Sequence, residues 1–203
     1  AGYCWLAVRD SPAAFGWPKI EEIEAAEGAP PAYAPGRAGI MESLRAVVFN
    51  RYTWPPFIAS AAMYSVFVTF AGVWGVPYLM QIYGMARVDA ANHVMALSVG
   101  YMAAGPAVGY ASDRLRLRRL PFLVCLTMFL AVWLLLTVWE GGKPPVAALY
   151  PLFFAIGAGA SGLTLVIACA KEVNPPNMTG IAAGLVNIGP FIGVALAQPL
   201  FGL

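Results

Sequence analysis

Five long stretches without Asp, Glu, Lys or Arg constrain the fold of this chain more than any other feature. They lie between Arg51 and Arg87, Asp89 and Asp113, Arg119 and Glu140, Lys143 and Lys171, and from Glu172 to the last residue. They contain 35, 23, 20, 27 and 31 residues. A helix needs about 20 apolar residues to cross the hydrocarbon core of a membrane, and its backbone amides must bond within the segment. We therefore predict an all-α membrane protein with about five transmembrane helices.

The composition of the chain also indicates a location in lipid. Hydrophobic residues make up 60% of the sequence, charged residues only 11%, and the mean hydropathy is +0.71. A soluble domain of this length needs more polar surface than that. We therefore expect the lipid bilayer as a partner and no nucleic acid. The three cysteines lie in apolar context without paired spacing, so we expect no disulfide, no metal site and no cofactor.

The positions of the basic residues predict the orientation of the helices. Lys and Arg near the ends of spans are retained on the cytoplasmic side of a membrane. If the segment before the first span is cytoplasmic, ten of the 12 basic residues face the cytoplasm, and Arg87 and Lys143 face the outside. We therefore predict that the segment from Gly109 to Arg119, between the second and third spans, is a cytoplasmic turn.

The chain divides into three regions by composition. Residues 1–8 are apolar but too short for a span, and we interpret them as the end of a truncated transmembrane helix. Residues 9–54 are rich in Pro and Glu and predict a cytoplasmic loop, which ends in a short helix along the membrane surface. Residues 55–203 form the predicted transmembrane bundle, which we expect to be incomplete. A natural truncation and an arbitrary cut explain the two ends equally well.

Glycines recur at close spacing in the later spans. The segment from Gly157 to Gly162 fits the dinucleotide-binding pattern G-x-G-x-x-G, but it lies inside a long uncharged run, where a pyrophosphate would sit in hydrocarbon. Small residues on membrane helices let neighbouring backbones approach closely, so we interpret the segment as a site of helix packing or flexing. The same small-x-x-x-small spacing is found in three further pairs, Gly105 and Gly109, Gly180 and Gly184, and Gly189 and Gly193.

The turn between the second and third spans resembles a family signature. Five charged residues lie between Gly109 and Arg119. The segment is similar to the loop signature of the major facilitator superfamily, G-x-x-[GAS]-D-R-x-G-R-[RK]. The residues that fit the signature are Gly109, Ser112, Asp113, Arg114, Arg118 and Arg119. The departures are Arg116, where the family prefers Gly, and Leu117, where it prefers Arg.

Two further segments resemble the same family. Residues 9–18 are similar to the start of the central loop that follows helix six, and residues 180–187 are similar to the opening of helix eleven. The resemblance implies that the chain covers the end of helix six, the central loop and helices seven to eleven of an incomplete C-terminal half. Helix twelve and the N-terminal half, which would be its partner in the same transporter, are missing.

The resemblance also implies a function and a location, and the charges of the turn give a hypothesis for its role. We expect a secondary active transporter that moves a small-molecule substrate by alternating access, located in a bacterial inner membrane. Asp113 would accept hydrogen bonds from the amides of a neighbouring helix N-terminus and latch one conformation. The arginines of the turn would pair with acidic groups or with anionic lipid headgroups. The alternative is that these charged residues only fix the topology.

The resemblance places helices seven and ten beside the substrate path. In helix seven Tyr64, Trp74 and Tyr78 share one helical stripe, and Gln81 lies just beyond it. Helix ten contributes Ser161 and Thr164, and helix eleven contributes Asn187. Aromatic rings with polar tips and small hydroxyls can stack on a solute and hydrogen-bond to it. Ordinary helix packing explains the same residues.

Three further predictions complete the interpretation. Pro77 should bend or break helix seven near its outer end, which makes it a candidate gate. His93, near the outer end of helix eight, favours a solvated interfacial role over proton coupling. No Ser, His, Cys or acidic residues cluster at one membrane depth, so we name no catalytic residues and do not expect an enzyme. A helical membrane scaffold that does not transport and a membrane-embedded enzyme are the alternative functions.

Overall fold

A computed structural model describes residues 39–201 of the chain, and every regular element in this range is a helix. The elements are α3 (Ile40–Phe49), α4 (Trp54–Thr69), η2 (Phe70–Trp74, a π-helix), α5 (Gly75–Tyr83), α6 (Arg87–Leu115), α7 (Arg119–Val138), η3 (Trp139–Gly141), α8 (Val146–Ala160), η4 (Ser161–Leu165), α9 (Val166–Glu172), η5 (Pro176–Met178) and α10 (Thr179–Phe201). The short helix predicted at the end of the loop is present as α3. The interpretations of residues 1–8 and 9–38 lie outside the described residues.

Five helical segments are long and apolar enough to cross a membrane, as the charge spacing predicts. They are Trp54–Tyr83, Arg87–Leu115, Arg119–Gly141, Val146–Glu172 and Pro176–Pro199, with 30, 29, 23, 27 and 24 residues. Several spans therefore combine more than one element, because short π or 3₁₀ segments interrupt their α-helices. The prediction of an all-α membrane protein with about five spans is confirmed.

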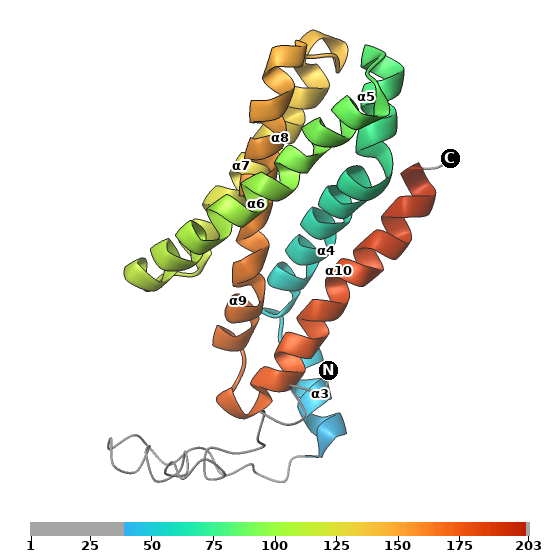
Figure 1. Cartoon of the computed structure of the whole chain (residues 1–203). Helices are drawn as coiled ribbons and strands as arrows, with labels where there is room; N and C mark the ends of the chain where they lie inside the picture. The colour runs from blue at the N-terminus through green and yellow to red at the C-terminus, as the bar shows by residue number, and fades with distance from the viewer. Residues whose placement is uncertain (1–38, 202–203) are drawn as a thin grey trace, which may run out of the picture. The chain divides into compact units, whose positions relative to one another are not determined.

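The spans pack as two closely associated pairs. Helix α6 crosses α8, and α4 runs beside α10 (Figure 1). Helix α7 packs on α8, α5 packs on α6, and α9 packs on α10. The fully buried side chains that join these helices include Met63, Leu79, Leu97, Phe153 and Ile156. The core therefore lies mainly among α4, α5, α6 and α8.

The crossing of α6 and α8 depends on two glycines that face each other. A Cβ on Gly157 would lie 1.9 Å from the carbonyl oxygen of Leu97, and a Cβ on Gly100 would lie 2.1 Å from that of Phe154. Side chains cannot be accommodated at these distances, because both obstacles are backbone atoms. The segment that matches the dinucleotide pattern is thus a helix contact, as the packing interpretation predicts.

The three further glycine pairs behave differently from one another. In α10 a Cβ on Gly193 would lie 2.2 Å from the carbonyl oxygen of Ala61, so the pair with Gly189 packs against α4. Gly105, Gly109, Gly180 and Gly184 have open space at the Cβ position among the described residues. Among the described residues, therefore, the spacing marks a close helix contact for Gly189 and Gly193 but not for the other two pairs.

The first span, Trp54–Tyr83, has an irregular turn next to Pro77. The π-helical segment η2 directly precedes α5, which contains Pro77 in its first turn. Proline has no amide hydrogen and its ring clashes with the carbonyl four residues earlier, and a wider turn relieves that clash. The span is thus not broken at Pro77, and a π-helical turn precedes the proline within a continuous helical segment.

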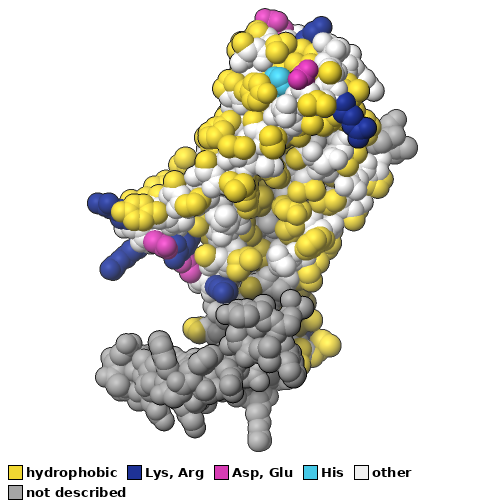
Figure 2. All heavy atoms as spheres, in the orientation of Figure 1, with side chains coloured by type: hydrophobic (Ala, Val, Ile, Leu, Met, Phe, Trp, Pro, Cys, Tyr) yellow, Lys and Arg dark blue, Asp and Glu magenta, His cyan; other side chains and the backbone are white. Residues whose placement is uncertain are grey.

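The bundle has two polar ends. On the face in view, charged side chains gather at the ends and hydrophobic side chains cover most of the surface between them (Figure 2). We call the end that holds the turn between α6 and α7 the basic end. The end of α9 and the start of α4 lie at the same end, because Arg118 of the turn bonds Glu172, and Asn174, which follows α9, bonds Thr53, which precedes α4. We call the end that holds η3 the opposite end.

Candidate functional site

The turn at the basic end begins with a left-handed residue. Helix α6 ends at Leu115, and Arg116 follows with φ 51° and ψ 28°, its amide bonded to the carbonyl oxygen of Asp113 at 3.2 Å. Glycine adopts this conformation most easily, which accounts for the family preference at this position. Arg116 thus takes a left-handed conformation at the position where the signature has glycine.

Arg118 joins three helix ends at the basic end. Its guanidinium pairs with Asp113 at the end of α6 and donates from Nε to Oε1 of Glu172, the last residue of α9, at 3.1 Å. It also donates to the hydroxyl of Ser112 at 3.1 Å. Arg118 itself immediately precedes α7. We call Ser112, Asp113, Arg118 and Glu172 the loop network.

The loop network stabilises the charged form of its arginine. The hydrogen bond to Asp113, and after it the bond to Glu172, raise the pKa of the Arg118 guanidinium above its ordinary value. Ser112 is fully buried, and its hydroxyl donates to the carbonyl oxygen of Leu117 at 3.3 Å. The serine therefore holds the turn against the end of α6, while both carboxylates stay largely exposed to solvent.

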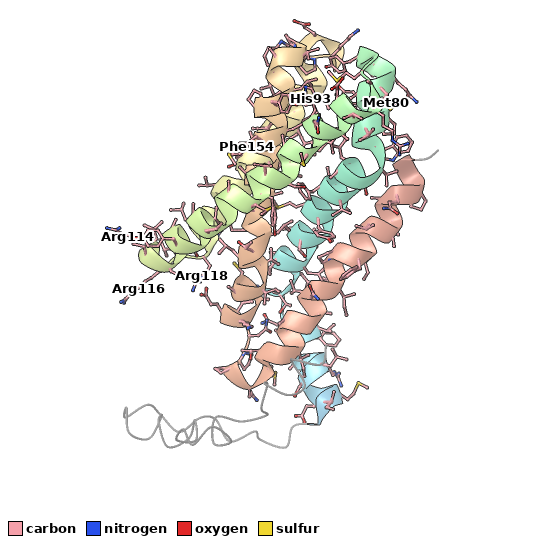
Figure 3. All side chains as sticks on the ribbon, in the orientation of Figure 1. Met80, His93, Arg114, Arg116, Arg118 and Phe154 are labelled. Carbon is pink, nitrogen blue, oxygen red and sulfur yellow. The ribbon has the colours of Figure 1, made fainter. Side chains whose placement is uncertain are left out.

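The structure brings together part of the predicted loop signature. Ser112, Asp113 and Arg118 meet in the loop network, whereas Arg114 donates to the hydroxyl of Tyr110 on its own helix at 3.0 Å. Arg119 is exposed. Figure 3 shows Arg114, Arg116 and Arg118 at one end of α6, away from His93. The partner of Asp113 among the described residues is a side chain, where the sequence predicted backbone amides.

The sequence interpretation missed Glu172. Glu172 follows Lys171 and separates the fourth and fifth long uncharged runs, so the same charge pattern that marks the spans also marks its depth. Its pairing with Arg118 connects residues 54 positions apart. A cavity of about 510 Å³ lies beside the pair, with Tyr52, Arg119 and Glu172 at its polar part and Phe122 and Leu126 on its apolar wall.

The residues predicted for the substrate path do not converge on one place. Ser161 is fully buried and donates to the carbonyl oxygen of Ala158 at 2.6 Å, and Thr164 donates to that of Ser161 at 2.8 Å. Both hydroxyls thus satisfy carbonyls of their own helix. The hydroxyl of Tyr78 donates to the carbonyl oxygen of Gly142 at 2.6 Å. These contacts give the three residues roles in holding the fold.

The other predicted residues lie at the surface of the described bundle. Trp74, Gln81 and Asn187 are exposed, and Tyr64 is half-buried beside Phe191 of α10, with ring centroids 6.5 Å apart. Trp74 lines an apolar groove of about 370 Å³ between α4 and α7. Tyr101 of α6, which the sequence interpretation missed, packs against Phe67 with ring centroids 5.8 Å apart. We call Tyr64, Phe67, Tyr101 and Phe191 the aromatic group, and they come from α4, α6 and α10.

The opposite end is held by aromatic side chains. Besides Tyr78, the hydroxyl of Tyr83 donates to the carbonyl oxygen of Pro144 at 2.7 Å. His93 is only 8% exposed and stacks on Tyr150, with ring centroids 3.9 Å apart. The prediction of a solvated interfacial His93 is therefore wrong: the ring lies between α6 and α8. Neither end, within residues 39–201, contains three or more His, Cys, Asp or Glu residues grouped to hold a metal ion.

These features define a class of protein before any comparison is made. Five apolar helical spans, glycine-mediated crossings and charge confined to the ends describe an integral, multi-pass membrane protein. A sequence model of the Major Facilitator Superfamily matches residues 3–198. The chain belongs to the major facilitator superfamily.

A curated relative gives a more distant likeness. The chain is similar to the membrane sensor protein UhpC of Escherichia coli (strain K12), with 28% identity over an alignment that covers 96% of this chain. The chain spans 44% of the length of that relative. No solved structure gives a significant match.

Proposed function

We propose that the whole protein is a secondary active transporter that moves a small solute by alternating access. This chain supplies helices seven to eleven, and the N-terminal half of the same transporter is its partner. Membership of the superfamily and the loop network on the matching signature residues support this proposal. The bacterial relative and the basic residues of the turn favour a bacterial inner membrane with the basic end in the cytoplasm.

The loop network acts as the conformational switch in this proposal. Arg118 holds the ends of α6 and α9 at the start of α7, so the basic end stays closed while its bonds are made. Pairs between exposed charges are individually weak, because water competes for both partners. A weak network suits a switch, since a transport cycle must make and break it repeatedly. Arg114, which bonds Tyr110 of its own helix, and Arg119 are exposed and can meet anionic headgroups.

The aromatic group is the proposed start of the solute path in this half. Tyr64 and Tyr101 are half-buried, and their rings pack against Phe191 of α10 and Phe67 of α4. Gln81 and Asn187 add exposed amides on two of the same spans. Rings with hydroxyls, together with amides, recognise a small polar organic solute by stacking and hydrogen bonding. Pro77 and the π-helical turn before it are the proposed hinge of the gate at the opposite end.

Uptake by the full-length protein tests the proposal directly. Uptake of a panel of radiolabelled metabolites into proteoliposomes would be measured, first with the proton gradient intact and then with it collapsed. We expect at least one solute to accumulate above the level of empty liposomes. Failure of the entire panel with a correctly folded protein, judged by a monodisperse size-exclusion peak, would contradict transport.

A sensor built on a transporter fold is the second candidate function. The similarity to a membrane sensor protein over 96% of this chain favours it. A sensor would bind a solute without accumulating it. Equilibrium binding of a panel solute without uptake into proteoliposomes would therefore favour sensing over transport.

A further inference from the structure

A second polar cluster at the basic end joins α9 to the segment that precedes α4. Asn174 is 6% exposed and Thr53 is 1% exposed. The side-chain amide of Asn174 donates to the hydroxyl of Thr53 at 2.9 Å, and its oxygen accepts from the amide of Asn50 at 3.0 Å. Asn50 and Thr53 lie between α3 and Trp54, the first residue of α4. The cluster thus connects segments more than 120 residues apart.

The same amides cap the end of α9. The last carbonyl groups of a helix have no partner within the helix. Here the carbonyl oxygen of Ala170 accepts from the side-chain amide of Asn174 at 2.8 Å, and that of Val173 accepts from Asn50 at 2.7 Å. The short contact to Ala170 fixes which way the Asn174 amide faces, because a carbonyl oxygen needs a donor. The end of α9 is therefore capped partly by a residue of a distant segment.

The use of Thr53 in this cluster follows from the two prolines after it. Thr53 is the N-cap residue of α4, where a threonine hydroxyl ordinarily accepts from the backbone amides two and three residues on. Those positions are Pro55 and Pro56, which have no amide hydrogen. The hydroxyl makes no cap bond to its own helix and bonds Asn174 instead.

The capped end of α9 carries Glu172 of the loop network. Glu172 lies between Ala170 and Val173, whose carbonyls are the two that the side-chain amides satisfy. A carboxylate in the last turn of a helix is opposed by the helix dipole, so its position depends on nearby donors. We propose that Asn50, Thr53 and Asn174 form a joint that positions Glu172 for Arg118, and so couples the segment before α4 to the loop network. As a part of the transport cycle, this joint rests on the proposed function.

Hydrogen exchange of the full-length protein tests the joint without requiring transport. The variant is Asn50→Ala, which removes the distant donor from outside the buried core, and Thr53→Ser, which keeps the hydroxyl, is its matched control. We expect Asn50→Ala to speed exchange at least about fivefold in peptides covering residues 170–176 and also 112–119. The control should leave both peptides unchanged. A change confined to residues 170–176 would overturn the proposal, because it would show a local cap without coupling.

Two further measurements complete the test: a double substitution, and separate determination of the maximal rate and KM. In an Arg118→Ala background, Asn50→Ala should no longer affect residues 112–119, because the connection through Glu172 is already lost. If the protein transports, Asn50→Ala should change the maximal rate about fivefold and leave KM within about twofold, since the joint lies away from the aromatic group. An effect on KM alone would contradict a positioning role, and absent uptake in the unmodified protein would refute the proposed function while leaving the exchange result valid.

Discussion

The basic end and the opposite end of the bundle are held together by different chemistry. At the basic end, most bonds between helices join side chain to side chain, with Arg118 between Asp113 and Glu172 and Asn174 between Asn50 and Thr53, and one further bond runs from Asn50 to the carbonyl oxygen of Val173. At the opposite end, the hydroxyls of Tyr78 and Tyr83 donate to backbone carbonyls, and His93 stacks on Tyr150. The first kind of contact can exchange partners as helices move, whereas the second fastens a loop.

In the proposed function, the exposed side-chain pairs of the basic end form the switch, and the tyrosine bonds of the opposite end stabilise the fold. The carboxylates of the loop network are exposed, so water can replace the arginine when the helices separate. Tyr78 and Tyr83 are half-buried and pack against each other, so an unpaired hydroxyl or carbonyl there is costly. We therefore expect substitutions in the loop network to alter transport, and substitutions that remove the bonds of Tyr78 and Tyr83 to alter mainly stability.

The largest effect should come from a substitution at the crossing of α6 and α8. Gly157→Val would push a side chain into the backbone of α6 near Leu97, at a cost of more than about 3 kcal/mol. We expect loss of the folded protein, measured as the yield of monodisperse protein after detergent extraction. Gly105→Val is the control, because that glycine faces open space among the described residues. Equal yields from the two variants would contradict the crossing.

Arg118→Ala should have the next largest effect, and on transport. It removes the bonds to Ser112, Asp113 and Glu172 together, so we expect the initial uptake rate to fall about tenfold or more. Arg118→Lys keeps the charge but not the forked geometry and should give an intermediate rate. Thermal unfolding should change little in both variants. A normal uptake rate in Arg118→Ala would exclude the loop network as the switch.

Pro77→Ala should have a moderate effect on the rate of the gate. Alanine restores an amide hydrogen, which favours a regular helix over the π-helical turn before it. We expect a fall of about threefold in the maximal uptake rate, with KM nearly unchanged. Unchanged transport would count against a hinge at this position.

Tyr83→Phe should have the smallest effect on transport. It removes one hydrogen bond, from the hydroxyl to the carbonyl oxygen of Pro144, and keeps the ring. We expect a loss of stability of about 1 kcal/mol, seen as a small decrease in the melting temperature, with uptake within about twofold. A large loss of uptake without a loss of stability would show that the bond between Tyr83 and Pro144 takes part in the transport cycle and does more than fasten a loop.

The number and the ends of the spans could be predicted from the sequence because charge spacing reports membrane depth. The same signal places Ser112, Asp113 and Arg118 together, since they are neighbours along the chain at one helix end. It could not identify Glu172 or Asn174, because their partners lie 54 and more than 120 residues away. Periodicity also cannot separate lining from packing: Ser161 and Thr164 share a stripe, yet both hydroxyls bond their own helix.

The accessibility of one introduced cysteine to a reagent outside the membrane tests the central claim, that the loop network closes the basic end. A cysteine would be introduced by Asn187→Cys, on the exposed surface of α10, into the full-length protein with its native cysteines replaced by serine. Its labelling rate by a membrane-impermeant maleimide would be measured from the outside, with and without Asp113→Asn. We predict at least about fivefold slower labelling with Asp113→Asn, because the closed basic end and hence the outward-open state would be less populated. The same labelling rate with and without the substitution would contradict the claim.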